Sequence, residues 1–182
     1  SSHHPDGISN AAGSLYLITV IIVAQMRILV APNAFKNSLA AADVAEAIKI
    51  GLEESKLQCT VDCFPVGDGG DGTADLILKY YNGKRVFVIV HDPLMRKISS
   101  SFGLMEGEKT AVIEMANASG LKLLRLNELD PLHTTSFGTG ELIKKSLDSG
   151  AKKIIVCIGG SATVDGATGS MRALGFRFLD KD

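Results

Sequence analysis

Residues 65–73 read Pro-Val-Gly-Asp-Gly-Gly-Asp-Gly-Thr, which places two carboxylates among four glycines. An apolar run at residues 59–64 leads into this stretch, and an apolar-periodic run at 74–81 leads out of it. This pattern predicts a passage from a strand to a helix, where open α/β sheets bind their ligands. Asp68 and Asp71 suit Mg²⁺ or a substrate hydroxyl. The alternative is a tight surface loop that carries solvated acids.

A second glycine-rich loop, residues 159–166, follows a β-branched strand-like run and precedes an expected helix. Its sequence, Gly-Gly-Ser-Ala-Thr-Val-Asp-Gly, offers backbone N–H groups and the positive end of a helix dipole to an anion. Ser161 and Thr163 could donate to phosphate or carboxylate oxygens, and Asp165 could hold a metal or orient a hydroxyl. The alternative is a glycine turn in which a hydroxyl caps the helix.

Two weaker signals lie in other loops. Residues 134–140, Thr-Thr-Ser-Phe-Gly-Thr-Gly, open an expected helix, although Ser and Thr are also the preferred N-cap residues. Lys36 follows the first expected strand and could meet a carboxylate or phosphate, the alternative being a solvated surface lysine. No G-x-x-x-x-G-K-[ST] motif is present, which argues against a P-loop enzyme. Such loops favour phosphoryl transfer by positioning and Mg²⁺ electrostatics.

The order of the expected elements predicts an α/β protein. The chain begins strand, helix, strand, helix, at residues 27–31, 40–54, 59–64 and 73–81. This alternation implies a parallel sheet. Three strands with short connections follow, at residues 85–90, 97–104 and 109–115, and they predict an antiparallel or mixed excursion. The remaining expectations are a short helix at 121–126, a helix at 141–148, a strand at 153–158, a helix at 167–174 and a strand at 176–179.

Composition narrows the class of partner. The chain has 182 residues, 46% of them hydrophobic and 21% charged, which is enough to bury the core of a domain. A formal charge of −1, no Trp and only 5% aromatic residues argue against nucleic acid as a partner. The three cysteines, at positions 59, 63 and 157, form no C-x-x-C pair, so we expect neither a disulfide framework nor a zinc knuckle. A reduced, cytoplasmic location is the natural expectation.

Five motifs, in this order along the chain, resemble those of the type I glycerate kinase family. They are Ala-Pro-Asn-Ala-Phe-Lys-Asn-Ser-Leu at 31–39, the stretch at 65–73, Glu-Met-Ala-Asn-Ala-Ser-Gly-Leu at 114–121, Asp-Pro-Leu-His-Thr-Thr-Ser-Phe-Gly-Thr-Gly-Glu-Leu-Ile at 130–143 and Ile-Gly-Gly-Ser-Ala-Thr-Val-Asp-Gly at 158–166. The resemblance covers residues 26–182 and only the N-terminal part of the family, so we expect a truncated chain. It implies phosphorylation of D-glycerate to a phosphoglycerate with ATP and Mg²⁺.

The resemblance also implies an architecture. Family members consist of two α/β domains, one Rossmann-like and the other inserted into it. We therefore expect residues 26–83 and 130–182 to form a Rossmann-like parallel sheet with helices on both faces, and residues 84–129 to begin a smaller inserted α/β lobe. Residues 1–25 are expected to be an extension foreign to the family, from a tag or upstream sequence, either disordered or carrying an extra apolar strand. Its apolar run is shorter than the about 20 residues of a membrane span, so no membrane anchor is expected.

Roles follow from the resemblance residue by residue. Asp68 would act as the base toward the substrate hydroxyl, Asp71 and Asp165 would support Mg²⁺, and Lys36 would hold the glycerate carboxylate or a transferring phosphate. The expected substrate- and phosphate-binding residues are Gly69, Gly70, Ser136, Gly138, Gly159, Gly160, Ser161 and Thr163. The alternative function is a truncated or diverged, non-catalytic fragment that binds a small anion or nucleotide.

The chain departs from the usual family motifs at a few positions. The first motif usually reads Asp-Ser where this chain has Asn33 and Ala34. The last motif usually has Asn where this chain has Val164, and a further Gly where it has Ala167. The change at Asn33 replaces an acid with an amide, and the change at Val164 removes a polar side chain.

Overall fold

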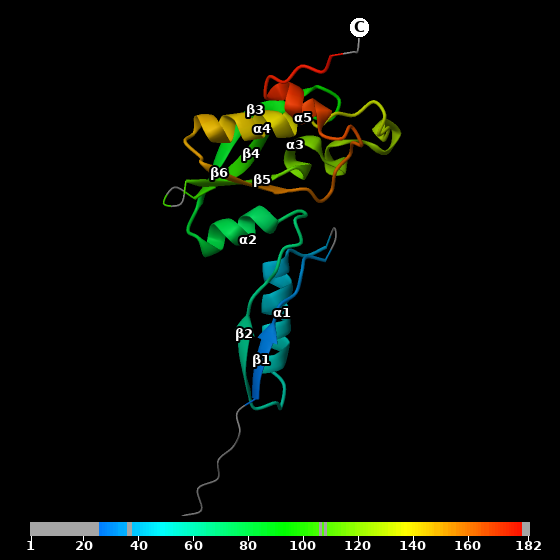
Figure 1. Cartoon of the computed structure of the whole chain (residues 1–182). Helices are drawn as coiled ribbons and strands as arrows, with labels where there is room; N and C mark the ends of the chain where they lie inside the picture. The colour runs from blue at the N-terminus through cyan, green and yellow to red at the C-terminus, as the bar shows by residue number, and fades with distance from the viewer. Residues whose placement is uncertain (1–25, 36–37, 106, 108, 180–182) are drawn as a thin grey trace, which may run out of the picture.

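The computed structural model describes residues 26–35, 38–105, 107 and 109–179 of the chain. The elements run in the order β1 Met26–Val30, α1 Ala41–Glu53, β2 Cys59–Cys63, α2 Thr73–Tyr80, β3 Lys84–His91, β4 Lys97–Met105, β5 Thr110–Glu114, α3 Ala116–Ser119, the 3₁₀ turns η1 Leu121–Leu123 and η2 Leu126–Glu128, α4 Phe137–Asp148, β6 Lys153–Cys157 and α5 Thr168–Ala173 (Figure 1). The α/β class expected from the sequence is confirmed.

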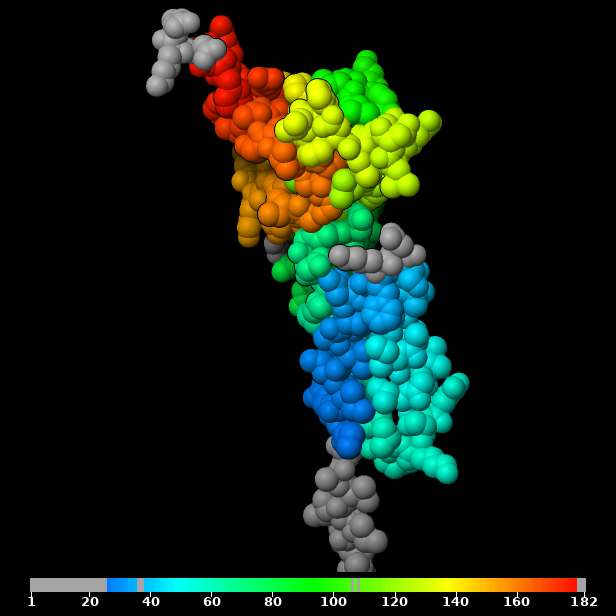
Figure 2. All heavy atoms as spheres, turned by 90° about the vertical axis from the view of Figure 1, so that its right-hand side faces the viewer, coloured from blue at the N-terminus to red at the C-terminus, as the bar shows by residue number. Residues whose placement is uncertain are grey.

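The strands form two separate sheets. β1 and β2 pair in parallel, with Met26 opposite Cys59 and Val30 opposite Cys63. The other sheet has the order β3-β4-β5-β6, in which the first two pairings are antiparallel and β5 pairs with β6 in parallel. Figure 2 shows β1, α1 and β2, coloured blue to cyan, extending away from the larger sheet and its helices.

The pairing of β6 differs from the expected division of the chain. A strand expected beside β1 and β2 instead pairs with β5, so residues on both sides of position 130 share one sheet. The physical reason lies in β5, whose five residues are all buried, as is typical of a central strand with neighbours on both edges. Antiparallel β4 occupies one edge of β5 and parallel β6 the other. Residues 84–129 and 130–182 therefore contribute strands to one sheet.

Helices cover both faces of the four-stranded sheet, as expected. Alternate residues of β5 point to opposite faces, which divides the core into two clusters. Ala111 and Ile113 belong to the cluster that contains Leu142 of α4. Val112 belongs to the other cluster, in which Leu78 of α2 and Cys157 of β6 pack.

Several expected elements are placed differently. Residues 176–179 form no strand and pair with none of the described strands. The helix expected at 121–126 is the pair of 3₁₀ turns, and α3 before it was not anticipated. The expectations for residues 1–25 lie outside the described residues. None of the described helices is both long and apolar enough to cross a membrane.

Candidate functional site

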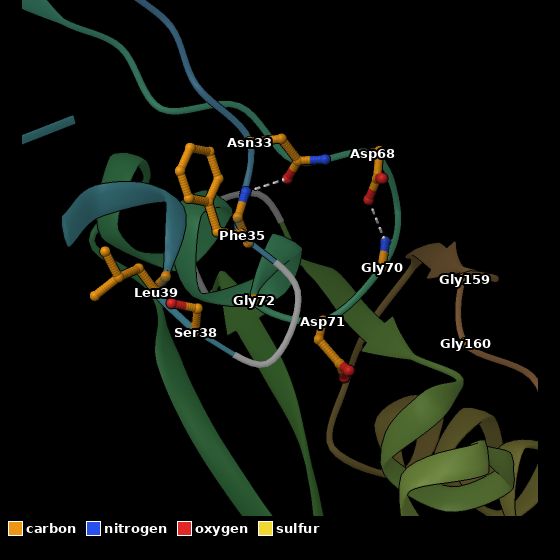
Figure 3. Close-up of a pocket in the computed structure, with 12 residues that line it drawn as sticks. Asn33, Phe35, Ser38, Leu39, Asp68, Gly70, Asp71, Gly72, Gly159 and Gly160 are labelled. Carbon is orange, nitrogen blue, oxygen red and sulfur yellow. Dashed lines mark hydrogen bonds between the residues drawn. The ribbon is translucent and has the colours of Figure 1, made fainter. Parts of the chain in front are cut away.

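A pocket of about 680 Å³ opens where three strands end. Loops that follow the carboxyl ends of β1, β2 and β6 surround it, in keeping with the rule that ligands of α/β proteins bind at this end of the strands. The lining residues are Asn33, Ala34, Phe35, Ser38, Leu39, Ala40, Asp68, Gly70, Asp71, Gly72, Gly159 and Gly160 (Figure 3). The site therefore unites the first, second and last of the sequence motifs.

The two glycine-rich loops touch directly. The backbone N–H of Gly159 donates to the carbonyl oxygen of Gly69 at 2.8 Å. A Cβ on Gly159 would lie 2.7 Å from the Cα of Gly70, closer than real Cβ atoms approach. Only glycine thus permits this contact, and the pairing of the two loops gives the pocket one of its walls.

Asp68 organises its own loop while it faces the pocket. Its Oδ1 accepts the backbone N–H of Gly70 at 2.9 Å, a local turn that fixes the direction of the carboxylate. Asn33 makes a similar contact in the neighbouring loop, where its Oδ1 accepts the N–H of Ala34 at 2.7 Å. Figure 3 shows the side chains of Asn33 and Asp68 on one side of the pocket and that of Asp71 on the other.

Asp71 is tied to residues beyond the pocket by an ion pair with Lys122. The ammonium of Lys122 also donates to Oδ1 of Asn117 at 2.8 Å. Asn117 in turn donates from Nδ2 to Oε2 of Glu114 at 3.1 Å. Glu114 is buried, and its Oε1 accepts the N–H of Ala74 in the first turn of α2 at 2.8 Å. This relay connects the loop after β2 to the end of β5.

Asp165 lies in a different cluster. Its Oδ2 accepts the N–H of Ser136 at 2.8 Å, the hydroxyl of Ser136 at 2.9 Å and the N–H of Gly169 at 3.1 Å, while Oδ1 accepts the N–H of Ala167 at 3.1 Å. Burial pushes the pKa of Asp165 upward, but these hydrogen bonds outweigh it and hold the pKa below that of an ordinary aspartate. Asp165 thus clamps the start of α4 to the start of α5, and it does not line the pocket.

The hydroxyl residues expected to bind phosphate are engaged within the protein. Ser136 is fully buried and bridges Asp165 and the backbone of Ser170. The hydroxyl of Thr163 donates to the carbonyl of Thr134 at 2.9 Å, and that of Ser161 donates to the carbonyl of Thr163 at 3.1 Å. The geometry gives these three side chains structural contacts away from the pocket lining.

Gly138, expected to bind phosphate, instead allows close packing. A Cβ at this position would lie 1.8 Å from the carbonyl oxygen of His91, so glycine lets α4 approach the end of β3. Gly69, Gly70, Gly159 and Gly160 do lie at the pocket or in its wall. Lys36 lies outside the described residues.

Sequence reasoning did not single out Lys122, Asn117 or Glu114 as functional residues. The sequence did contain a sign that two of them could be functional, because Glu114 and Asn117 belong to one of the five motifs and Glu114 ends a strand. Lys122 gave no signal of its own, since a single lysine in a short helix is solvated by default.

The lining carboxylates are the type of donor that a magnesium ion takes. Mg²⁺ is held by oxygen ligands, with one or two carboxylates and the remaining positions taken by water or substrate phosphates. Asp68 and Asp71 provide two such carboxylates in the pocket lining. Oδ1 of Asp71 already faces the ammonium of Lys122. Among the described residues, no group of three or more His, Cys, Asp or Glu side chains is arranged to hold a metal.

Comparison with known proteins identifies the family of this chain. The model of the glycerate kinase family matches residues 28–182, so the chain belongs to the glycerate kinase family. It is similar to glycerate kinase from Bacillus subtilis (strain 168), with 46% identity over 155 residues, which cover 85% of this chain and 41% of the relative. Glycerate 2-kinase from Escherichia coli (strain K12) shows the same identity and coverage.

A solved structure gives the same result for the fold. A crystal structure assigned as glycerate kinase 2 from Salmonella typhimurium LT2 superposes with a TM-score of 0.69 at 44% identity, over 83% of this chain and 40% of that one. The chain thus spans about two fifths of the length of the relatives it matches.

Proposed function

We propose that this chain forms part of a kinase site that transfers a phosphoryl group from ATP to D-glycerate with the help of Mg²⁺, giving a phosphoglycerate. The observation that carries the proposal is the pocket where the loops after β1, β2 and β6 converge with Asp68, Asp71 and the glycine pair at 159–160. The curated relatives are named as glycerate kinases, which supplies the substrate class. Because the chain spans only part of their length, other parts of the site are expected to come from the remainder of such a protein.

The residues of the pocket take distinct roles in this proposal. Asp68 accepts the proton of the attacking glycerate hydroxyl, because its carboxylate is held at the pocket by the N–H of Gly70. Asp71 would hold Mg²⁺ through its carboxylate. When bound, Mg²⁺ would neutralise negative charge on the transferring phosphoryl group. Gly70, Gly159 and Gly160 contribute backbone to the pocket lining, where a ligand can approach the main chain closely.

An ADP-release assay tests the proposal on a protein in which this chain is joined to the remaining part of a glycerate kinase, such as the Bacillus subtilis relative. With saturating ATP and Mg²⁺, we expect release of ADP that depends on D-glycerate, and L-glycerate serves as the matched control substrate. Release at the same rate with and without D-glycerate would contradict transfer to glycerate.

A second function, a non-catalytic module that binds a small anion or nucleotide, is favoured by one specific observation. Asn33 presents an amide in the pocket where family motifs usually have a carboxylate, which removes a potential base or metal ligand. Calorimetric binding of D-glycerate or ATP without any ADP release would support this second function.

We also propose a cytoplasmic location, which the free state of Cys59, Cys63 and Cys157 supports.

A further inference from the structure

Lys122 carries a positive charge next to a lining carboxylate of the pocket, although it is not itself a lining residue. Its ammonium forms an ion pair with Asp71, one of the lining carboxylates, and donates to Oδ1 of Asn117 at 2.8 Å. The described lining of the pocket includes two carboxylates and neither Lys nor Arg. An anionic ligand that binds there therefore meets repulsion from Asp68 and Asp71 unless a cation lies close by.

The position of Lys122 is fixed by a buried framework. Asn117 donates from Nδ2 to Oε2 of Glu114, so its amide oxygen must face the other way, toward the ammonium. Glu114 has only 4% of its surface exposed, and its second oxygen accepts the N–H of Ala74. A buried carboxylate anchored to both β5 and α2 thus sets the direction of the amide that holds Lys122.

Lys122 also keeps capacity to bind a ligand. An ammonium has three N–H donors, and those of Lys122 are directed to Asp71 and Asn117, with no further acceptor among the described residues. Its side chain is 42% exposed, so solvent and ligands reach the remaining donor.

We infer that Lys122 is an anion-binding residue of this pocket, whose remaining N–H donates to a carboxylate or phosphate oxygen of the bound ligand. The inference rests on the proposed function for the identity of that ligand, which is D-glycerate or the phosphates of the nucleotide. Contact with Asp71 keeps the ammonium beside the residue proposed to hold Mg²⁺, so the same lysine also sets the charge balance there.

Calorimetric titration of the chain with D-glycerate, ADP and inorganic phosphate tests this inference. The variants are Lys122→Met and Lys122→Arg, with Lys144→Met as control, because Lys144 lies exposed on α4 and does not line the pocket. We expect K122M to weaken binding of at least one probe by about tenfold or more, since a charge-assisted hydrogen bond is lost. K122R should restore part of that affinity, and K144M should leave it unchanged.

The pattern across probes identifies the ligand. Loss confined to D-glycerate assigns Lys122 to the substrate carboxylate, and loss confined to ADP and phosphate assigns it to the nucleotide. Salt dependence separates binding from a structural role, because K122M should flatten the dependence of log affinity on log salt concentration while a purely structural change would leave the slope intact.

Two results overturn the inference. One is binding of all three probes by K122M within about twofold of the unmodified chain, a difference below 0.5 kcal/mol. The other is an unmodified chain that binds none of them. Failure of the proposed function looks different, because phosphate or ADP would then bind in a Lys122-dependent manner while D-glycerate would not bind.

Discussion

The backbone N–H of Gly159 donates to the carbonyl oxygen of Gly69 at 2.8 Å, and this hydrogen bond joins two loops that lie 90 positions apart in the sequence. One loop follows β2 in the small sheet, and the other follows β6 in the larger sheet. The contact therefore connects the two sheets at the pocket. It also explains why both loops are rich in glycine at this point.

Gly159→Ala should separate the two loops. The new Cβ would lie 2.7 Å from the Cα of Gly70 and 2.8 Å from the carbonyl oxygen of Gly69, so the backbone has to move. We expect a loss of about 1–3 kcal/mol in the free energy of unfolding, measured by urea denaturation, together with weaker D-glycerate binding. Gly51→Ala is the matched control, because its Cβ meets nothing within 4 Å in α1 and should stabilise the chain by about 0.5–1 kcal/mol. Equal stability of the two variants would contradict the contact.

Asp165→Asn should weaken the junction between α4 and α5 more than it affects ligand binding. Its carboxylate accepts hydrogen bonds from Ser136, Gly169 and Ala167, and an amide cannot accept all of them. We expect a loss of about 1–3 kcal/mol of unfolding free energy with D-glycerate affinity unchanged. Asp148→Asn, at the exposed end of α4, is the control and should be neutral.

The lowered pKa of Asp165 also predicts that the free energy of unfolding depends on pH in the acid range. Because the folded pKa of Asp165 is lowered, its contribution is complete above the ordinary aspartate pKa of about 4 and is lost as the pH falls through the lower folded value. The difference in unfolding free energy between the unmodified chain and Asp165→Asn should therefore shrink below about pH 4. A difference that stays constant or grows with acid would count against this role.

Ala167→Gly should stabilise the protein. Ala167 has φ +64° at the N-cap of α5, a left-handed conformation that costs a residue with a Cβ about 1–2 kcal/mol. Glycine also gains conformational entropy in the unfolded chain, which offsets part of this benefit. We therefore expect the free energy of unfolding, measured by thermal or denaturant unfolding, to rise by about 0.5–1 kcal/mol. Ala47→Gly, on the exposed side of α1, should instead lose about 1 kcal/mol. Destabilisation by both changes would refute the strain at Ala167.

Asp68→Asn separates the role of base proposed for Asp68 from its structural role. The amide oxygen of Asn can still accept the N–H of Gly70, so the loop and the stability of the chain should be preserved. The variant cannot act as a base. In a protein that joins the chain to the remaining part of a glycerate kinase, D-glycerate-dependent ADP release should fall by about a hundredfold or more while D-glycerate binding persists. Turnover close to that of the unmodified chain would remove Asp68 from the role of base.

Local features of this fold could be predicted from sequence because they depend on local patterns. The periodicity of α1 and the apolar runs of β1 and β2 place these elements within about two residues of their observed bounds. The partner of β6 could not be predicted in this way. An apolar, β-branched strand suits any buried parallel neighbour, and the choice of β5 depends on which strand edge remains open after the chain has folded.

For the candidate site, the sequence likewise predicted the loops but not the directions of their side chains. Loops at strand ends were found correctly, because glycines and acids after apolar runs mark them, and Asp68, Asp71 and Gly159 do meet in one pocket. The directions of side chains were not available from spacing. For this reason Ser136 and Thr163, which resemble phosphate ligands in sequence, make internal contacts in the structure, and Lys122 was missed.

The central claim is that D-glycerate binds between the loop at 65–73 and the glycine pair at 159–160. The most direct test is a titration of the ¹⁵N-labelled chain with D-glycerate, followed through its assigned backbone amide resonances. We predict saturable shifts for Gly70, Gly72 and Gly160, which line the pocket, and no comparable shift for Ser136, which is fully buried elsewhere. Saturable shifts confined to residues outside the pocket, or no shift at any D-glycerate concentration, would contradict the claim.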